Sequence, residues 1–204
     1  MISSNTRATA LIELAFIIFA ATGCAPASVY PLSDERDSKL DERLLGKWRE
    51  ASKISANGPI DFQVRRKAGS ETALEIVYVD PGSDKQEEET MQVYATKIGE
   101  FDYLTCRDLE TRRDAKQQAA AFTILQYRVV GENRVDIYRM DNRSVAEAIN
   151  QGELKGQYFG LTARKASCVV ISDSSENIRR YLEKHGADCF DRGEELLSFK
   201  RSTD

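Results

Sequence analysis

The stretch FTILQYRVVGENRVDIYRM, residues 122–140, decides how this chain is expected to fold. Two runs rich in β-branched and aromatic residues, at 122–130 and 134–140, lie on either side of Gly131-Glu132-Asn133. Strand-forming residues on both sides of a short link that contains glycine are typical of a β-hairpin. The sequence therefore predicts two antiparallel strands here.

Apolar and polar residues alternate with a period of two in several other stretches, as they do in strands with one buried face. The clearest example is 60–65, where Ile60, Phe62 and Val64 alternate with polar neighbours. Together with the hairpin, about eight or nine short strands separated by turn residues predict a mainly β fold, an antiparallel barrel or sandwich. The other expected strands lie at 45–50, 74–79, 91–96, 101–106, 168–172 and 196–201.

Two short helices are expected to interrupt the strands. Ser144 and Glu147 have the spacing of a capping box, and Gly152 follows the apolar residues of this segment. A second helix is predicted to begin at Asp173 and to end at Gly186.

The amino-terminal segment has the composition of a secretory signal. Arg7 supplies a positive charge, an apolar core follows over 8–21, and small residues precede Cys24. The apolar core is shorter than the ~20 residues that span a bilayer, which disfavours an uncleaved transmembrane helix.

This arrangement resembles the lipobox of bacterial lipoproteins, in which the cysteine is acylated and the signal peptide is cut just before it. The resemblance implies a signal peptide at 1–23, a lipidated Cys24 and a membrane-anchored protein of the cell envelope. Ala25, where some lipoproteins have aspartate, resembles the outer-membrane sorting pattern of Gram-negative cells, on the periplasmic face. A secreted or helix-anchored protein and a cytosolic protein are the alternatives.

The remaining chain divides into a tether and one domain. Residues 24–40, polar or small with two prolines, are expected to form the lipidated cysteine and a flexible tether with a span of about 20–25 Å. Residues 41–204 are enough for a single domain with its own core. The net charge of −4 and the pI of about 5.3 argue against broad nucleic-acid binding.

Gly46-Lys47-Trp48, where the first strand is expected to begin, resembles the Gly-x-Trp signature that opens the lipocalin barrel. The resemblance implies a single lipocalin-like barrel in which Trp48 plugs the floor. It also implies a basic residue of the last strand, Arg201 or Lys200, stacked on that tryptophan. A typical lipocalin has its helix after the last strand, whereas the helix at 173–186 precedes it here. The alternative is that Trp48 is an ordinary core aromatic residue.

Three cysteines follow Cys24 in the sequence. Cys168 and Cys189 flank the second predicted helix, and an oxidising compartment permits disulfides, so a bridge between them is one hypothesis. The other is that each of the three, Cys106 included, is a small buried apolar residue.

No pattern in the sequence predicts a catalytic residue, a metal ligand or a cofactor. His185, the only histidine, precedes a helix-ending glycine, where a cation suits the helix dipole. The acidic run at 84–89 lies between two expected strands and is interpreted as a solvated loop.

Two hypotheses of function follow from these patterns. In the first, the barrel holds a small apolar ligand or lipid, against inward-facing residues such as Phe62, Ile76, Val93 and Tyr127. In the second, the barrel is solid, and its surface or the loop at 153–166 binds another protein of the envelope.

Overall fold

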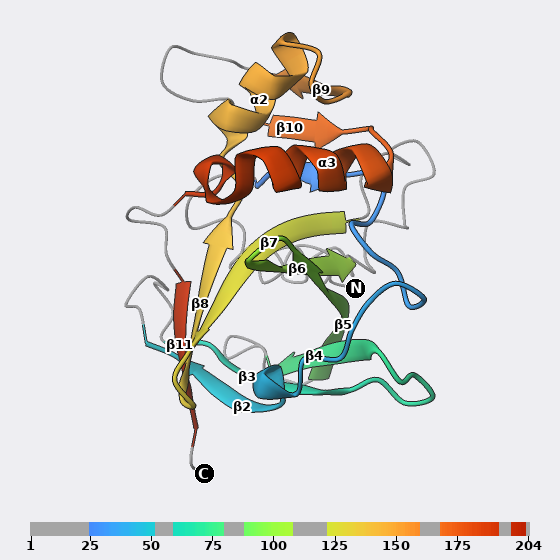
Figure 1. Cartoon of the computed structure of the whole chain (residues 1–204). Helices are drawn as coiled ribbons and strands as arrows, with labels where there is room; N and C mark the ends of the chain where they lie inside the picture. Colours follow the sequence, from blue (N-terminus) through green and yellow to red (C-terminus); the bar gives the residue numbers. More distant parts are fainter. Residues whose placement is uncertain are drawn as a thin grey trace, which may run out of the picture.

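The computed structural model describes residues 25–51, 59–79, 88–107, 122–159, 168–191 and 197–202. Its main body is a closed antiparallel β-barrel of eight strands (Figure 1). Seven strands form a meander from β2 to β8, and β11 closes the barrel by pairing with both β8 and β2. The predicted mainly β barrel is therefore confirmed. The barrel strands are β2 (Gly46–Glu50), β3 (Asp61–Arg66), β4 (Ala73–Val79), β5 (Glu88–Ile98), β6 (Phe101–Arg107), β7 (Phe122–Val130), β8 (Arg134–Arg139) and β11 (Leu197–Arg201).

A small α/β layer is inserted between the last two strands of the barrel. It comprises α2 (Asn142–Asn150), β9 (Gly156–Phe159), β10 (Cys168–Ile171), α3 (Ser175–His185) and the 3₁₀ turn η3 (Gly186–Cys189). The two-residue strand β1 (Ala27–Ser28) connects this layer to the barrel, because it pairs with β7 on one side and with β10 on the other. We call β1, β10 and β9 the wing of the sheet; it lies at the end of the molecule away from β2 and β3 (Figure 1).

Both predicted helices exist, but their first residues differ from the prediction. The N-cap of α2 is Asp141, whose carboxylate accepts hydrogen bonds from the backbone N–H groups of Arg143 and Ser144. The N-cap of α3 is Ser174, and Asp173 instead accepts hydrogen bonds from Lys155, Ser174 and Asn177. The N-cap lies three residues before the predicted Ser144 in α2 and one residue after the predicted Asp173 in α3. Serine and aspartate both cap exposed N–H groups, so the residue type alone does not fix the start.

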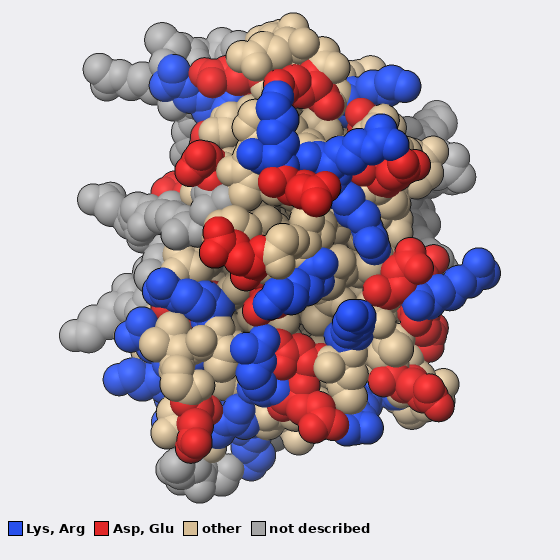
Figure 2. Space-filling model, in the orientation of Figure 1, with Lys and Arg blue, Asp and Glu red and all other residues tan. Residues whose placement is uncertain are grey.

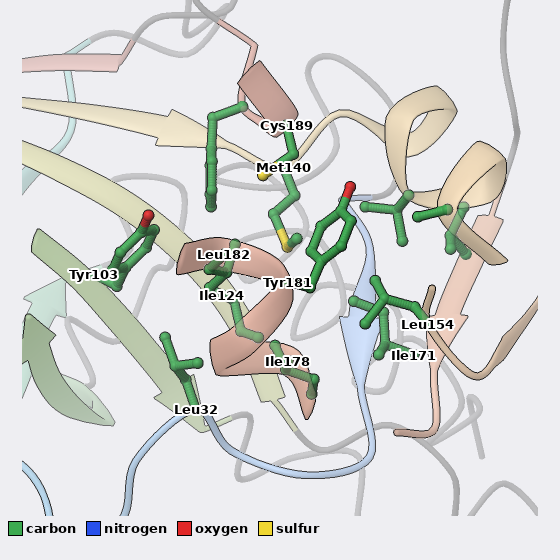
Figure 3. Close-up of a cluster of buried hydrophobic side chains, with 14 of the residues drawn as sticks. Leu32, Tyr103, Ile124, Met140, Leu154, Ile171, Ile178, Tyr181, Leu182 and Cys189 are labelled. Atoms are coloured by element: carbon green, nitrogen blue, oxygen red, sulfur yellow. The ribbon is translucent and has the colours of Figure 1, made fainter. Parts of the chain in front are cut away.

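The barrel wall has a hydrophobic core on each of its faces. Inside the barrel, Leu104 and Leu125 belong to a core that includes Trp48 and that we call the inner core. Their neighbours along the strands, Tyr103 and Ile124, point outward and pack in a second core under α3, which we call the outer core (Figure 3). Successive residues of a strand face opposite sides, so β6 and β7 are buried on both faces.

The segment that was expected to be a tether is part of the fold. Leu32 is fully buried in the outer core, beside α3 (Figure 3). The hydroxyl of Ser175 donates a hydrogen bond to the carbonyl of Pro31, and Nε of Arg179 donates one to the carbonyl of Leu32. The prediction of a flexible tether up to residue 40 is therefore wrong, because burial of Leu32 and pairing of β1 fix this segment on the domain.

Candidate functional site

One end of the barrel is closed by Trp48 and the 3₁₀ turn η1 (Glu42–Leu44). The indole is almost completely buried, and its Nε1 donates a hydrogen bond to the carbonyl of Leu44 over 2.7 Å. The polar atom of the tryptophan is thus satisfied within the interior, as buried indoles require. The remaining surface of the ring packs in the inner core.

Arg201 covers the tryptophan from the last strand. Its guanidinium lies 4.5 Å from the centroid of the Trp48 ring. Nη1 donates to the carbonyl of Leu45 over 2.5 Å, and Nη2 donates to the carbonyl of Arg43 over 2.9 Å. Lys200, the other expected partner, is exposed. The structure thus places Arg201 on the barrel floor.

A polar cluster lies beside this floor. The hydroxyl of Tyr127 donates a hydrogen bond to Oδ2 of Asp41 over 2.7 Å, and Arg43 forms ion pairs with both Asp41 and Asp102. Burial raises the pKa of Tyr127, and the bond to Asp41 adds to that shift. Burial also acts to raise the pKa of Asp41, but hydrogen bonds from Arg43 and Tyr127 outweigh it and lower that pKa. The cluster holds η1 against the barrel.

The half of the barrel interior that lies away from η1 contains a cavity of about 40 Å³. Its lining comes from the strand ends that lie away from η1, such as Tyr78 near the end of β4 and Cys106 near the end of β6. Two residues of its lining, Phe62 and Phe199, pack edge to face with ring centroids 4.8 Å apart. The lining residues are Phe62, Ile76, Tyr78, Met91, Leu104, Cys106, Leu125, Ile137, Arg139, Leu197 and Phe199.

The lining of this cavity is mainly apolar. Burial raises the pKa of the Cys106 thiol to about 12, so the thiolate that nucleophilic chemistry needs is not formed near neutral pH. Arg139 is the one charged residue of the lining, and it is buried. The cavity therefore suits binding of an apolar group.

Of the four residues that were expected to line a ligand site, two line the cavity and two do not. Phe62 and Ile76 line the cavity, as predicted. Val93 and Tyr127 also point into the barrel but do not line the cavity. Tyr127 lies at the floor, where its hydroxyl is bound to Asp41, and Val93 packs in the solid part of the inner core. Alternation identified the inward face correctly but not the height of each residue along the barrel.

The hypothesis of a disulfide between Cys168 and Cys189 is wrong. The two sulfur atoms are not bonded to each other. Cys189 is buried in the outer core beneath α3, and its thiol donates a hydrogen bond to the carbonyl of Gly186 (Figure 3). Cys168 lies at the start of β10, paired with Phe159 of β9.

Glu153, outside the barrel, forms ion pairs with basic residues of α3. Nε2 of His185 lies 2.7 Å from Oε2 of Glu153, and Lys184 pairs with the same carboxylate. Hydrogen bonds from Lys184 and His185 lower the pKa of Glu153. The described residues contain no group of three or more side chains arranged to hold a metal ion. Residues 84–87 of the acidic run lie outside the described residues, and the other two begin β5.

Acidic and basic side chains are interspersed over the face of the molecule in Figure 2, without a large area of one sign. Among the described residues, no helix is long and apolar enough to span a bilayer. No family model matches the chain, and no match was found among curated proteins or solved structures. The features that bear on function are therefore the amino-terminal signal in the sequence and the barrel itself.

Proposed function

We propose that this chain is a cell-envelope lipoprotein, anchored through an acylated Cys24, whose barrel holds a small apolar ligand or one part of a lipid. The cavity carries the ligand proposal: it lies in a barrel whose opposite end is closed by Trp48, and most of its lining residues are apolar. Apolar pockets of this kind bind by removing the ligand's surface from water. The lipobox resemblance at Cys24 supports the anchor.

The size of the cavity limits the class of ligand. An engineered cavity of about 150 Å³ accepts benzene, which is well above the about 40 Å³ enclosed here. A ligand must therefore be slender, and the lining must move to admit it. Met91 is the side chain best suited to move, because its unbranched thioether adopts many rotamers. A single acyl chain is the shape that such an adjustment accommodates.

Extraction of the purified domain, residues 25–204, with organic solvent tests the proposal. An apolar molecule identified by mass spectrometry is expected at about one per barrel. Ile76→Phe, which fills the cavity, should reduce its yield several-fold. Val93→Ile enlarges an interior residue outside the lining and should leave the yield unchanged. A yield that does not respond to Ile76→Phe would contradict binding in the cavity.

The small volume of the cavity favours a second candidate: an envelope lipoprotein with a solid barrel that binds a protein through its surface. In that case the extract contains no apolar molecule, and Ile76→Phe changes only the stability of the domain. The expected change is about 1–3 kcal/mol, the usual effect of overpacking a core. The extraction therefore separates the two candidates.

A further inference from the structure

Two large apolar side chains are exposed among the described residues, one in the wing and one just after its strand β1. Phe159, the last residue of β9, is 60% exposed, and Tyr30, two residues after β1, is 49% exposed. Single exposed apolar residues are common, but aromatic side chains beside an apolar sheet face indicate a binding surface.

The pairing of the wing strands shows which residues share a face with Phe159. Residues directly opposite one another in a sheet point to the same side. Phe159 is opposite Cys168, Gln157 is opposite Val170, and Val170 is also opposite Ala27. We call these five residues the outer wing face. It contains no charged side chain and one polar one.

The opposite side of the wing is already occupied. Val169 and Ile171 are fully buried in the outer core, and Tyr158 packs against it. On the outer wing face, Ala27, Cys168 and Val170 are half-buried, and Phe159 is exposed. The wing therefore presents an apolar surface away from its own core.

The place of Cys24 in the sequence suggests which partner faces this surface. Cys24 is three residues before Ala27, a separation of at most about 11 Å for a fully extended chain. Because β1 is hydrogen-bonded to both β7 and β10, Ala27 cannot move away from the domain. Neighbouring strands are ~4.8 Å apart, so β9 lies about 10 Å from β1. An acyl chain on Cys24 therefore brings the whole wing to the bilayer.

We propose that the outer wing face docks on the lipid bilayer that anchors Cys24, with Phe159 at the level of the lipid headgroups. This inference depends on the acylation of Cys24 proposed above. Aromatic side chains are enriched at the membrane–water interface, where a ring replaces headgroup contacts with water. Because the face carries no charge, docking occurs on neutral lipid and does not weaken in high salt.

Fluorescence quenching by brominated lipids tests this orientation. The acylated protein carrying Phe159→Trp is reconstituted into phosphatidylcholine vesicles with either plain or brominated acyl chains. The unsubstituted protein supplies the background of Trp48, the only tryptophan of the chain. Ala68→Trp, at an exposed position in the turn between β3 and β4, is the matched control away from the wing.

At least two-fold quenching is expected for the added tryptophan of Phe159→Trp, and none for that of Ala68→Trp, at both low and high salt. Equal fluorescence of Phe159→Trp in the two kinds of vesicle, or equal quenching at both positions, overturns the docking of this face. Vesicle flotation is measured on the same samples. A protein that floats without quenching of Phe159→Trp refutes the orientation alone, whereas one that does not float refutes the anchor as well.

Discussion

The guanidinium of Arg201 lies over the ring of Trp48, with its carbon 4.5 Å from the ring centroid. Arg201 is the last residue of the last barrel strand, and Trp48 is the third residue of the first. The two residues are also direct partners in the β2–β11 ladder. One contact thus joins the two strands that close the barrel and seals its floor.

Gly46 is expected to be intolerant of substitution because of this contact. Its φ is +128°, and a Cβ there would lie 2.5 Å from Nη1 of Arg201. Gly46→Ala should therefore lower the free energy of unfolding by more than about 1 kcal/mol, measured by urea denaturation. In an Arg201→Ala background the clash is removed and only the backbone strain remains, so the effect of Gly46→Ala should be smaller. Strictly additive effects of the two substitutions would contradict this account.

The bond between Tyr127 and Asp41 predicts a pH dependence of stability. Tyr127→Phe should lower the free energy of unfolding by about 1.5–3 kcal/mol at pH 7, the usual value of a hydrogen bond to a charged group. The pKa of Asp41 is lowered in the folded protein, so its contribution is complete above its ordinary pKa of 3.8 and is lost as the pH falls below it. The difference between parent and variant should therefore shrink in acid, as followed by denaturation at several pH values. A difference that is the same at pH 7 and in acid would argue against the ionised bond.

Leu32 should contribute to stability as a core residue, although it lies in a segment that resembles a tether. Leu32→Ala is expected to lower the free energy of unfolding of residues 25–204 by about 2–5 kcal/mol, because it leaves a cavity in the outer core. Tyr30→Ala, at the exposed position two residues before it, is the control and should change stability by less than about 0.5 kcal/mol. Similar small effects of both substitutions would mean that the segment is not packed on the domain.

The three cysteines after Cys24 should all be thiols in the purified domain. Alkylation of the unfolded domain without a reductant is expected to add three groups, counted by mass spectrometry. In the folded domain, Cys106 and Cys189 should react slowly, because burial raises the pKa of each to about 12. A product with one added group would show that a disulfide forms after all.

The barrel could be predicted from the sequence because each of its strands has one face in the interior. Phe62, Val64 and Ile76, which the period-two pattern assigns to the buried face, all pack in the core inside the barrel. The same pattern cannot give the height of a residue in the barrel. Tyr127 and Leu125 have the same parity on β7, yet Leu125 lines the cavity and Tyr127 is bound to the floor.

Of the wing, only β10 was predicted, as the strand expected at 168–172, because β1 and β9 are too short to show a period. β1 has two residues and depends on pairing with the distant strands β7 and β10, whereas β9 has four residues and pairs with the nearby β10. The pairing of Ala27 with β7 joins positions about 95 residues apart, which no local pattern records. The tether was mispredicted for the same reason: the composition of residues 25–40 is that of a linker, and only burial of Leu32 shows otherwise.

The mass of the mature amino-terminal peptide tests the central claim most directly. The protein is purified from membranes after expression with its full leader, digested, and its first peptide is identified by mass spectrometry. The account predicts a chain that begins at Cys24 and carries the added mass of fatty-acyl groups on that residue. A mature chain that begins elsewhere, or one whose Cys24 carries no acyl group, would contradict it.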